Sequence, residues 1–406
     1  MGQEHQTGYQ CASYLSPLDD SEQPFALWVP PNYNPRRQYA LIVALHGMDG
    51  DERMISEKCF NIPDRGFSDE VILLSVFGRG DIAFEGPGEA DFWDTIQWVR
   101  DRYRVNPSRQ YLTGLSMGGY ATWRLAVEYP EQWAAVAPVC GGGDVNALQA
   151  LRDVPVWCVH GANDEFVSVN ESRRLVEELR RLDFTHRYDE LESWGHNSWE
   201  WLYDPDRHKD TLVDWFLKFR KDHPAVPVRH PRRLGGFKDL FLERLIISYP
   251  ARTPIPGEAE LLRNEAERIA RYSFGDFVMK SGKLLVKADH EISPADLANA
   301  NHLMLGRNDN HAWLKKAERQ LVARHVRGML KLRGETFLGK SLVAATCQTS
   351  PWNREKLLGV ITYQQHSQVR SISERLCGPA ADPLSVNLFD TQRRRFILQE
   401  AGTDAR

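Results

Sequence analysis

Short apolar runs alternate with amphipathic stretches along the first half of the chain. Between the third and fourth runs, Ala90 to Tyr103 repeats apolar residues at helical spacing. Near-continuous apolar strands separated by helices are typical of a parallel sheet covered on both faces. The pattern therefore predicts an α/β domain with a mostly parallel, doubly wound sheet, which a helix at 211–221 would close. The predicted strands are Phe25–Val29, Tyr39–Leu45, Val71–Val76, Gln110–Thr113, Ala134–Val139, Val154–Val159 and Arg187–Leu191.

The alternation of strands and helices starts again after a proline-rich stretch. Three prolines between His223 and Arg233 can neither continue a helix nor pair in a sheet, so this stretch is interpreted as a linker. We expect a catalytic domain at 1–222, a linker at 223–234 and a second, smaller α/β domain at 235–406. The elements expected in the second domain are strands at 245–249, 284–288, 302–305, 341–346, 356–363 and 384–389 and helices at 258–272 and from 293.

Composition narrows the classes of function. The chain has 406 residues, 42% of them hydrophobic and 26% charged, with a net charge of −4. This charge provides no general attraction for nucleic acid or anionic lipid, and no apolar run has the length of a membrane span. We therefore expect neither a nucleic-acid nor a membrane partner, and leave oligomerisation open. The N-terminus lacks a signal-peptide pattern, so we expect a cytoplasmic protein, with export of a longer precursor left open.

The sequence indicates no metal or cofactor. Its six cysteines are scattered, with no C-x-x-C and no histidine at ligand spacing. The second domain has no G-x-G-x-x-G after its first strand, so a dinucleotide site is not expected, and its role stays open.

The candidate chemistry begins at the segment 114–119, Gly-Leu-Ser-Met-Gly-Gly, between a strand and a helix-like stretch. Glycines flanking Ser116 suit the sharp strand-to-helix turn that exposes a nucleophilic hydroxyl. A serine needs a base and an orienting carboxylate, which on such a sheet follow in the order acid, then histidine. Asp164 follows a strand end and is the predicted acid, although a turn role or its neighbour Glu165 are alternatives. His196, in the loop after the next strand, is the predicted general base.

Acyl transfer also needs hydrogen-bond donors for the developing oxyanion. The usual donors are two backbone amides, one from the residue after the nucleophile and one from the loop after an earlier strand. Here they would belong to Met117 and Met48. His46, just before that loop, is expected to hold it in place. Trp93 and Trp199 are candidate substrate contacts, although packing between helices and loops is an equal alternative.

Several motifs together resemble a known family. The segments 88–93, 103–123, 138–144, 160–164 and 195–199 are similar to those of α/β-hydrolases in the polyhydroxybutyrate-depolymerase-like and feruloyl-esterase-like group, which merges with propeller-less prolyl-oligopeptidase-type hydrolases. The resemblance covers residues 10 to 220 and implies an α/β-hydrolase fold with Ser116, Asp164 and His196 as a triad. Through the segments 300–310 and 350–353, the second half resembles, more loosely, an α/β extension that follows the catalytic domain in some multidomain bacterial peptidases.

Three hypotheses about function follow. The first is a serine carboxylesterase, feruloyl- or acetyl-esterase-like, acting through an acyl-enzyme on a small-molecule or polysaccharide-linked ester. The second is a serine peptidase on short peptides, which would share every catalytic residue. The third is a non-catalytic binding or scaffolding protein, against which the complete set of catalytic motifs counts.

Overall fold

The computed structural model describes residues 6–207, 210–228, 236–377 and 385–400. The chain divides into two compact units. The first comprises Met1–Tyr14, Glu22–Phe84 and Asp91–Arg229, and the second comprises Leu15–Ser21, Glu85–Ala90 and His230–Arg406. The predicted linker at 223–234 lies partly outside the described residues, and the predicted domain boundaries stay a prediction.

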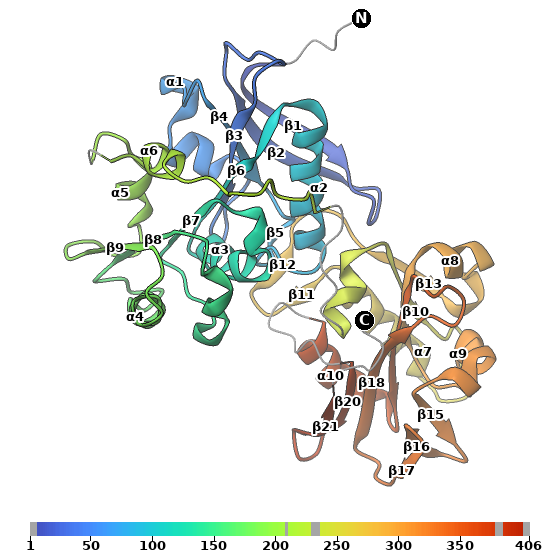
Figure 1. The fold of residues 1–406 in the computed structure, drawn as a ribbon. Coiled ribbons are helices and arrows are strands. Elements are labelled where there is room, and N and C mark those ends of the chain that lie inside the picture. The colour runs from blue at the N-terminus through green and yellow to red at the C-terminus, as the bar shows by residue number, and fades with distance from the viewer. Residues whose placement is uncertain (1–5, 208–209, 229–235, 378–384, 401–406) are drawn as a thin grey trace, which may run out of the picture. The chain divides into compact units, whose positions relative to one another are not determined.

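The first unit is built on an eight-stranded sheet, in the order β1-β2-β4-β3-β6-β7-β8-β9 (Figure 1). In this order, all neighbouring strands from β4 through β3 to β9 pair in parallel, whereas β2 pairs antiparallel with β4. This mostly parallel sheet confirms the predicted fold class. The strands are β1 (Gly8–Leu15), β2 (Glu22–Val29), β3 (Tyr39–Leu45), β4 (Val71–Val76), β6 (Val105–Leu115), β7 (Ala135–Val139), β8 (Val156–Gly161) and β9 (His186–Leu191).

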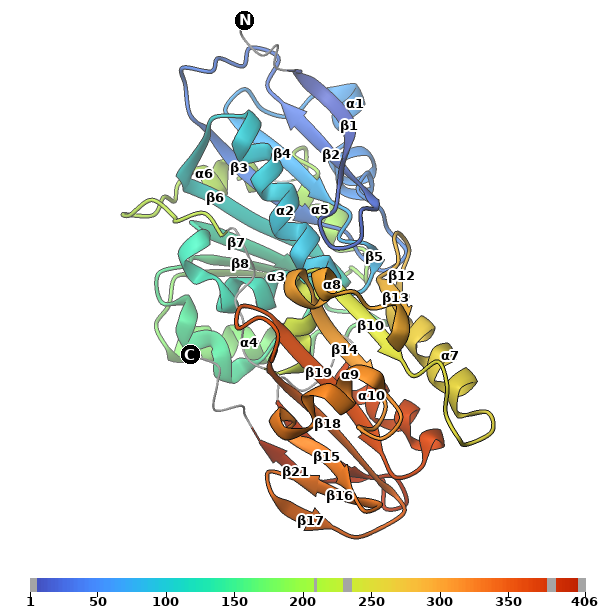
Figure 2. The ribbon, with the colours of Figure 1, turned by 90° about the vertical axis from the view of Figure 1, so that its right-hand side faces the viewer.

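Two cores bury the two faces of this sheet. Along β3, Leu41, Val43 and Leu45 belong to one core and Ala40, Ile42 and Ala44 to the other, as the alternation of side chains along a strand requires. Helices α2 (Pro87–Arg102), α3 (Met117–Glu128) and α4 (Asn170–Arg181) pack on the first face. Helices α5 (Trp199–Tyr203) and α6 (Leu212–Leu217) pack on the second (Figure 2).

The second unit has a seven-stranded sheet, in the order β13-β10-β14-β19-β18-β20-β21. Its first four strands are parallel and its last three antiparallel, so it is a mixed sheet (Figure 2). The strands are β10 (Leu245–Tyr249), β13 (Leu285–Ala288), β14 (Asn301–Leu305), β18 (Leu342–Thr349), β19 (Leu357–Tyr363), β20 (Val386–Asp390) and β21 (Arg395–Glu400). Its helices are α7 (Glu258–Ala270), α8 (Pro294–Asn299), α9 (Ala312–Ala317) and α10 (Val369–Leu376).

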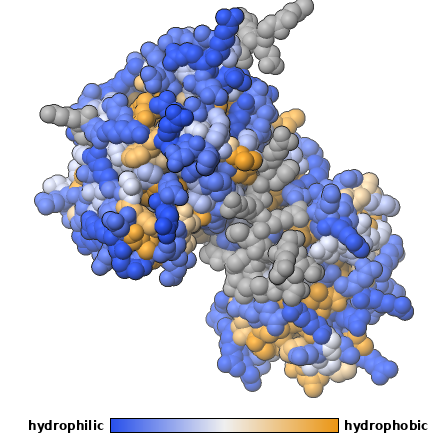
Figure 3. All heavy atoms as spheres, in the orientation of Figure 1, coloured by the Kyte–Doolittle hydropathy of each residue, from blue (hydrophilic) through white to orange (hydrophobic). Residues whose placement is uncertain are grey.

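Smaller elements complete the two units. They are α1 (Ile62–Arg65), β5 (Gly80–Asp81), β11 (Ser273–Phe274), β12 (Phe277–Met279), β15 (Ala323–Val326), β16 (Met329–Leu332) and β17 (Glu335–Phe337). Hydrophilic residues predominate on the face drawn in Figure 3, and the apolar residues there form small groups. Within the described residues, no helix combines the length and apolar character needed to cross a membrane.

Candidate active site

Ser116 lies at the sharp turn between β6 and α3. Its backbone has φ 54° and ψ −116°, a conformation that residues other than glycine rarely adopt. The turn is held by the Ser116 amide, which donates to the carbonyl of Val139 over 3.0 Å. A strained residue in a turn fixed by its neighbours is the geometry that exposes a hydroxyl beyond the end of a strand.

Three glycines make room for this turn. A Cβ at Gly114 would lie 2.4 Å from the carbonyl oxygen of Gly118. At Gly118 it would lie 2.2 Å from the carbonyl oxygen of Leu45, and at Gly119 2.3 Å from that of Val139. Side-chain carbons do not approach backbone oxygens so closely, so any other residue at these three positions would displace the surrounding backbone. The glycine spacing in the sequence therefore has a direct steric cause.

The structure brings the three predicted side chains into one chain of hydrogen bonds. The Oγ of Ser116 lies 2.9 Å from Nε2 of His196, and Nδ1 of His196 lies 2.7 Å from Oδ2 of Asp164. Because a carboxylate only accepts, Nδ1 carries a proton and Nε2 is left to accept the serine hydroxyl. The side chain of His196 remains 19% exposed, so the imidazole is open to solvent on one side.

The carboxylate of Asp164 is fixed by four donors. Oδ1 accepts the backbone N–H groups of Phe166 at 2.9 Å and Val167 at 2.8 Å, while Oδ2 accepts from His196 and, at 3.1 Å, from Nε2 of His160. Burial alone would raise the pKa of Asp164, but the hydrogen bonds from Val167, His196 and Phe166 outweigh it and hold the pKa below its ordinary value. The carboxylate is thus ionised and oriented toward the imidazole.

His160 is a second histidine on the same carboxylate, a contact that the sequence analysis missed. Its ring is fully buried, and Nε2 also lies 3.0 Å from the carbonyl oxygen of Val167, so this nitrogen donates to two acceptors. Its Nδ1 lies 2.7 Å from the hydroxyl of Ser172. Burial lowers the pKa of His160 and keeps the ring neutral. The i,i+4 spacing from Asp164 spans a strand end, where sequence alone gives no reason for contact.

The two loops predicted to supply oxyanion donors lie against each other. A Cβ at Gly47 would be 2.7 Å from Cδ1 of Leu115 and 3.4 Å from Cβ of Ser116, so the loop that carries Met48 packs on the serine turn. Nδ1 of His46 lies 2.7 Å from the carbonyl oxygen of Gly47, and Nε2 lies 2.9 Å from that of Phe77, as expected of a residue that holds this loop. The donor roles of Met48 and Met117 stay predictions.

Trp93 is not placed to contact a substrate. Its side chain is 1% exposed and packs against Tyr129 and Trp133 in the core between α2 and α3. The prediction for this residue was wrong, because Trp93 lies with Phe92 and Ile96 on the face of α2 that packs into the core. Trp199, by contrast, lies edge-on to the His196 ring, with centroids 5.3 Å apart. Its substrate role stays a prediction.

Phe166 is an aromatic residue at the site that the sequence analysis did not select. Its ring centroid lies 5.3 Å from that of His196, and the side chain is 82% exposed. The signal available in the sequence was an aromatic residue two positions after the predicted acid, in the loop that follows the strand.

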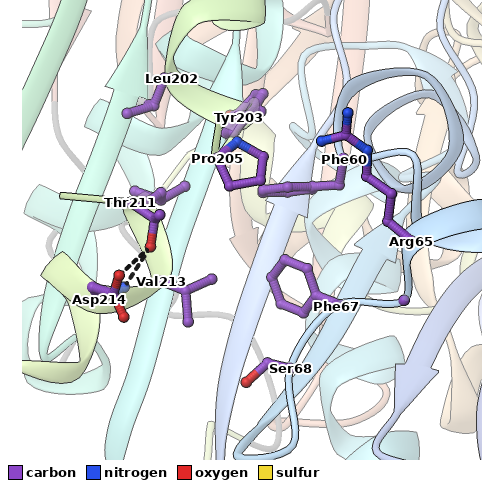
Figure 4. Close-up of a pocket in the computed structure, with 12 residues that line it drawn as sticks. Phe60, Arg65, Phe67, Ser68, Leu202, Tyr203, Pro205, Thr211, Val213 and Asp214 are labelled. Atoms are coloured by element: carbon purple, nitrogen blue, oxygen red, sulfur yellow. Dashed lines mark hydrogen bonds between the residues drawn. The ribbon is translucent and has the colours of Figure 1, made fainter. Parts of the chain in front are cut away.

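A hollow of about 340 Å³ in the first unit has none of the triad residues in its lining (Figure 4). Phe60, Phe67 and Tyr203 supply much of its wall. Near its rim, Arg65 pairs with Asp204. This hollow is therefore separate from the hydrogen-bonded chain described above.

One group of side chains in the described residues has metal-ligand spacing. The ligand atoms of Cys140, Asp164 and His196 lie within 4.8 Å of one another. Burial raises the pKa of the Cys140 thiol, which opposes the thiolate form that a metal requires. Asp164 and His196 are already bonded to each other. These three residues therefore suit proton transfer better than metal binding.

Comparison with known proteins adds a family. Residues 18–206 match the model of the esterase family, described as "Putative esterase". A bifunctional acetylxylan esterase/xylanase of Neocallimastix patriciarum is 29% identical over 166 residues, which are 38% of this chain and 23% of that protein. A probable feruloyl esterase C of Aspergillus oryzae is 26% identical over 152 residues, 36% of this chain and 56% of that protein.

Among solved structures, a thermostable esterase is 29% identical, with a TM-score of 0.46 over 52% of this chain and 63% of that chain. The present chain thus spans about a quarter and about half of the lengths of the two curated relatives. The family match, the parallel sheet and the serine turn agree on one assignment. Residues 18–206 of this chain are similar to the esterase family, and the structure gives the first unit the sheet order and the serine turn expected of an α/β-hydrolase fold.

Proposed function

We propose that this protein hydrolyses carboxylic esters through an acyl-enzyme on Ser116. The observation that carries the proposal is the chain of hydrogen bonds from Ser116 through His196 to Asp164, at 2.9 and 2.7 Å. This chain lets the imidazole accept the serine proton while the buried carboxylate stabilises the imidazolium that forms.

In the first step, Oγ of Ser116 attacks the ester carbonyl carbon as Nε2 of His196 takes its proton. The tetrahedral oxyanion would be stabilised by the amides of Met117 and Met48, and loss of one such donor costs about 3 kcal/mol of barrier in related chemistry. The intermediate collapses when His196 returns the proton to the departing alkoxide, leaving an ester between the acyl group and Ser116. Water, deprotonated by His196, then attacks this ester. The second tetrahedral intermediate collapses as His196 returns the proton to Oγ of Ser116, which releases the acid and restores the enzyme.

The named relatives support a substrate class. One is an acetylxylan esterase and another a probable feruloyl esterase. We therefore propose small-molecule or polysaccharide-linked acetyl or feruloyl esters as substrates. A peptidase would use the same triad, so the preference between ester and amide has to be measured.

The test compares matched esters and amides of the acetyl and feruloyl groups, with Ser116→Ala as the control. We expect hydrolysis of the esters, amide turnover at least a hundredfold slower, and labelling of Ser116 by a fluorophosphonate. Comparable turnover of an ester and its amide would favour a peptidase. Folded protein that neither labels nor hydrolyses any ester would favour the scaffolding hypothesis.

A further inference from the structure

Phe166 places an exposed ring beside the imidazole, and its backbone is held by the carboxylate of the same site. Its backbone N–H donates to Oδ1 of Asp164 over 2.9 Å, so its main chain is fixed by the same carboxylate that orients His196. Its ring plane is tilted by 50° to the imidazole, with centroids 5.3 Å apart. The side chain is nevertheless 82% exposed, so its ring contributes little to the core of this unit.

The chemistry of the step assigns a side of the ester to this ring. His196 returns its proton to the departing oxygen, so that oxygen must lie within hydrogen-bond reach of Nε2. The alcohol portion of the ester then extends along the imidazole, where Phe166 lies. In the proposed mechanism, the oxyanion faces the loop that carries Met48. This loop packs on the serine turn, where Gly47 closely approaches Ser116.

Trp199 occupies a different position around the same imidazole. It meets the His196 ring at 90°, and its side chain packs partly against the core beneath α5 and α6. Trp199 is therefore partly engaged by the core of the first unit. Phe166 presents its surface to solvent, where an incoming alcohol can stack on it.

Resting on the proposed ester hydrolysis, we propose that Phe166 forms a subsite for the alcohol portion of the substrate and selects alcohols that carry a ring with a flat apolar face, such as an aryl or a sugar ring. A small alcohol such as methanol cannot cover this ring, so contact with the ring adds nothing to its binding. Selectivity for the alcohol thus depends on a residue that takes no part in proton transfer.

The test uses the full chain and two acetyl esters whose alcohols have similar basicity, benzyl acetate and methyl acetate. The measured quantity is the ratio of kcat/KM for benzyl acetate to that for methyl acetate, so a general loss of activity cancels. We expect Phe166→Ala to lower this ratio by about three- to tenfold, the effect of losing one aromatic contact. Phe166→Trp keeps a ring and should retain at least half of the ratio.

Val226→Ala is the matched control. Val226 is also an exposed apolar residue, at 77%. The amide of its neighbour Ala225 donates to the carbonyl of Pro107, near the start of β6, whereas Ser116 follows the other end of that strand, so Val226 lies away from the candidate active site. This variant should leave the ratio unchanged. An unchanged ratio in Phe166→Ala, or an equal fall in Val226→Ala, would overturn the subsite. If the wild type hydrolyses neither these acetates nor the benzyl and methyl esters of ferulic acid measured in the same way, the proposed function itself fails, which is a distinguishable result.

Discussion

The two main sheets of this protein both carry polar side chains at the carboxyl ends of parallel strands, but these side chains have different roles in the two units. In the first unit, these side chains form a chain that ends at Ser116 and at the partly exposed His196. In the second unit, Arg307 after β14 pairs with the fully buried Glu258 at the start of α7, over 2.9 Å. Tyr363, at the end of β19, donates to the same carboxylate over 3.0 Å.

The difference lies in where each set of hydrogen bonds ends. In Asp164, Oδ1 accepts two backbone N–H groups, and Oδ2 accepts the hydrogen bond from the imidazole of His196. The carboxylate of Glu258 is used by groups that are themselves buried, such as Tyr363, which also accepts from Asn310 over 3.2 Å. Similar strand-end chemistry thus gives a reactive site in one unit and a structural cluster in the other.

The largest expected effect is on the reactive chain. Ser116→Ala should lower kcat for an acetyl ester by about 10⁴-fold or more, because it removes the hydroxyl that is proposed to form the acyl-enzyme. The measurement is steady-state hydrolysis together with circular dichroism to verify folding. Retained activity in the folded variant would remove the contrast between the two units.

The next effect concerns the structural cluster. Arg307→Met should destabilise the second unit by about 3 kcal/mol, because it leaves Glu258 buried without its cation. Asp309→Asn is the control, since Asp309 also contacts Arg307 but is 62% exposed and should cost less than about 0.5 kcal/mol. Denaturant unfolding and hydrogen exchange on peptides of this unit would measure both. Equal effects would show that burial does not govern this ion pair.

A smaller effect is expected at His160. His160→Leu removes one donor from Asp164, which should lower kcat by about tenfold with little change in KM. The pKa of Asp164 should then rise toward its ordinary value, so activity should be lost at a higher pH than in the wild type. His160→Gln can still donate and should recover part of both effects. A uniform loss of activity without a change in the pH profile would indicate a packing role only.

The smallest expected effect concerns the carboxyl group of Asp94 and the pH dependence of stability. Burial and the nearby Asp91 raise the pKa of Asp94 to about 7. Because the folded state keeps this proton to higher pH than the unfolded state, stability should fall as the pH rises from about 4 to 7. Asp94→Asn should therefore stabilise the protein by about 1–2 kcal/mol at pH 8 and hardly at all at pH 4. Equal shifts in thermal unfolding at both pH values would contradict this ionisation.

Much of the fold and of the site was predictable because the signals are local. The glycine spacing around Ser116 indicated the turn, and the strand ends before Asp164 and His196 located the other two residues that the structure brings together. Strand β6 was only partly predicted, because it begins at Val105, which pairs with Tyr39, and reaches the apolar run only after an irregular stretch at 106–109. Edge strand β1 was missed because it lacks a regular apolar alternation.

The remaining errors concern contacts that only the folded chain creates. Trp93 and Trp199 have equal hydrophobic character in the sequence, yet one is enclosed between helices and the other meets the imidazole. His160 and Phe166 flank Asp164 in sequence, but their contacts depend on how the loop after β8 folds around the carboxylate. Periodicity gives the face of an element, whereas such contacts require the positions of several loops at once.

The central claim is that Ser116 carries the acyl group. Rapid quenching of the enzyme during hydrolysis of an activated acetyl ester, followed by mass spectrometry of its peptides, tests this claim most directly. The account predicts one acetyl group on Ser116, formed within the first turnover and absent from Ser116→Ala. Full ester hydrolysis with no acetyl group on Ser116 at any quench time, or the same rate of hydrolysis in Ser116→Ala, would contradict it.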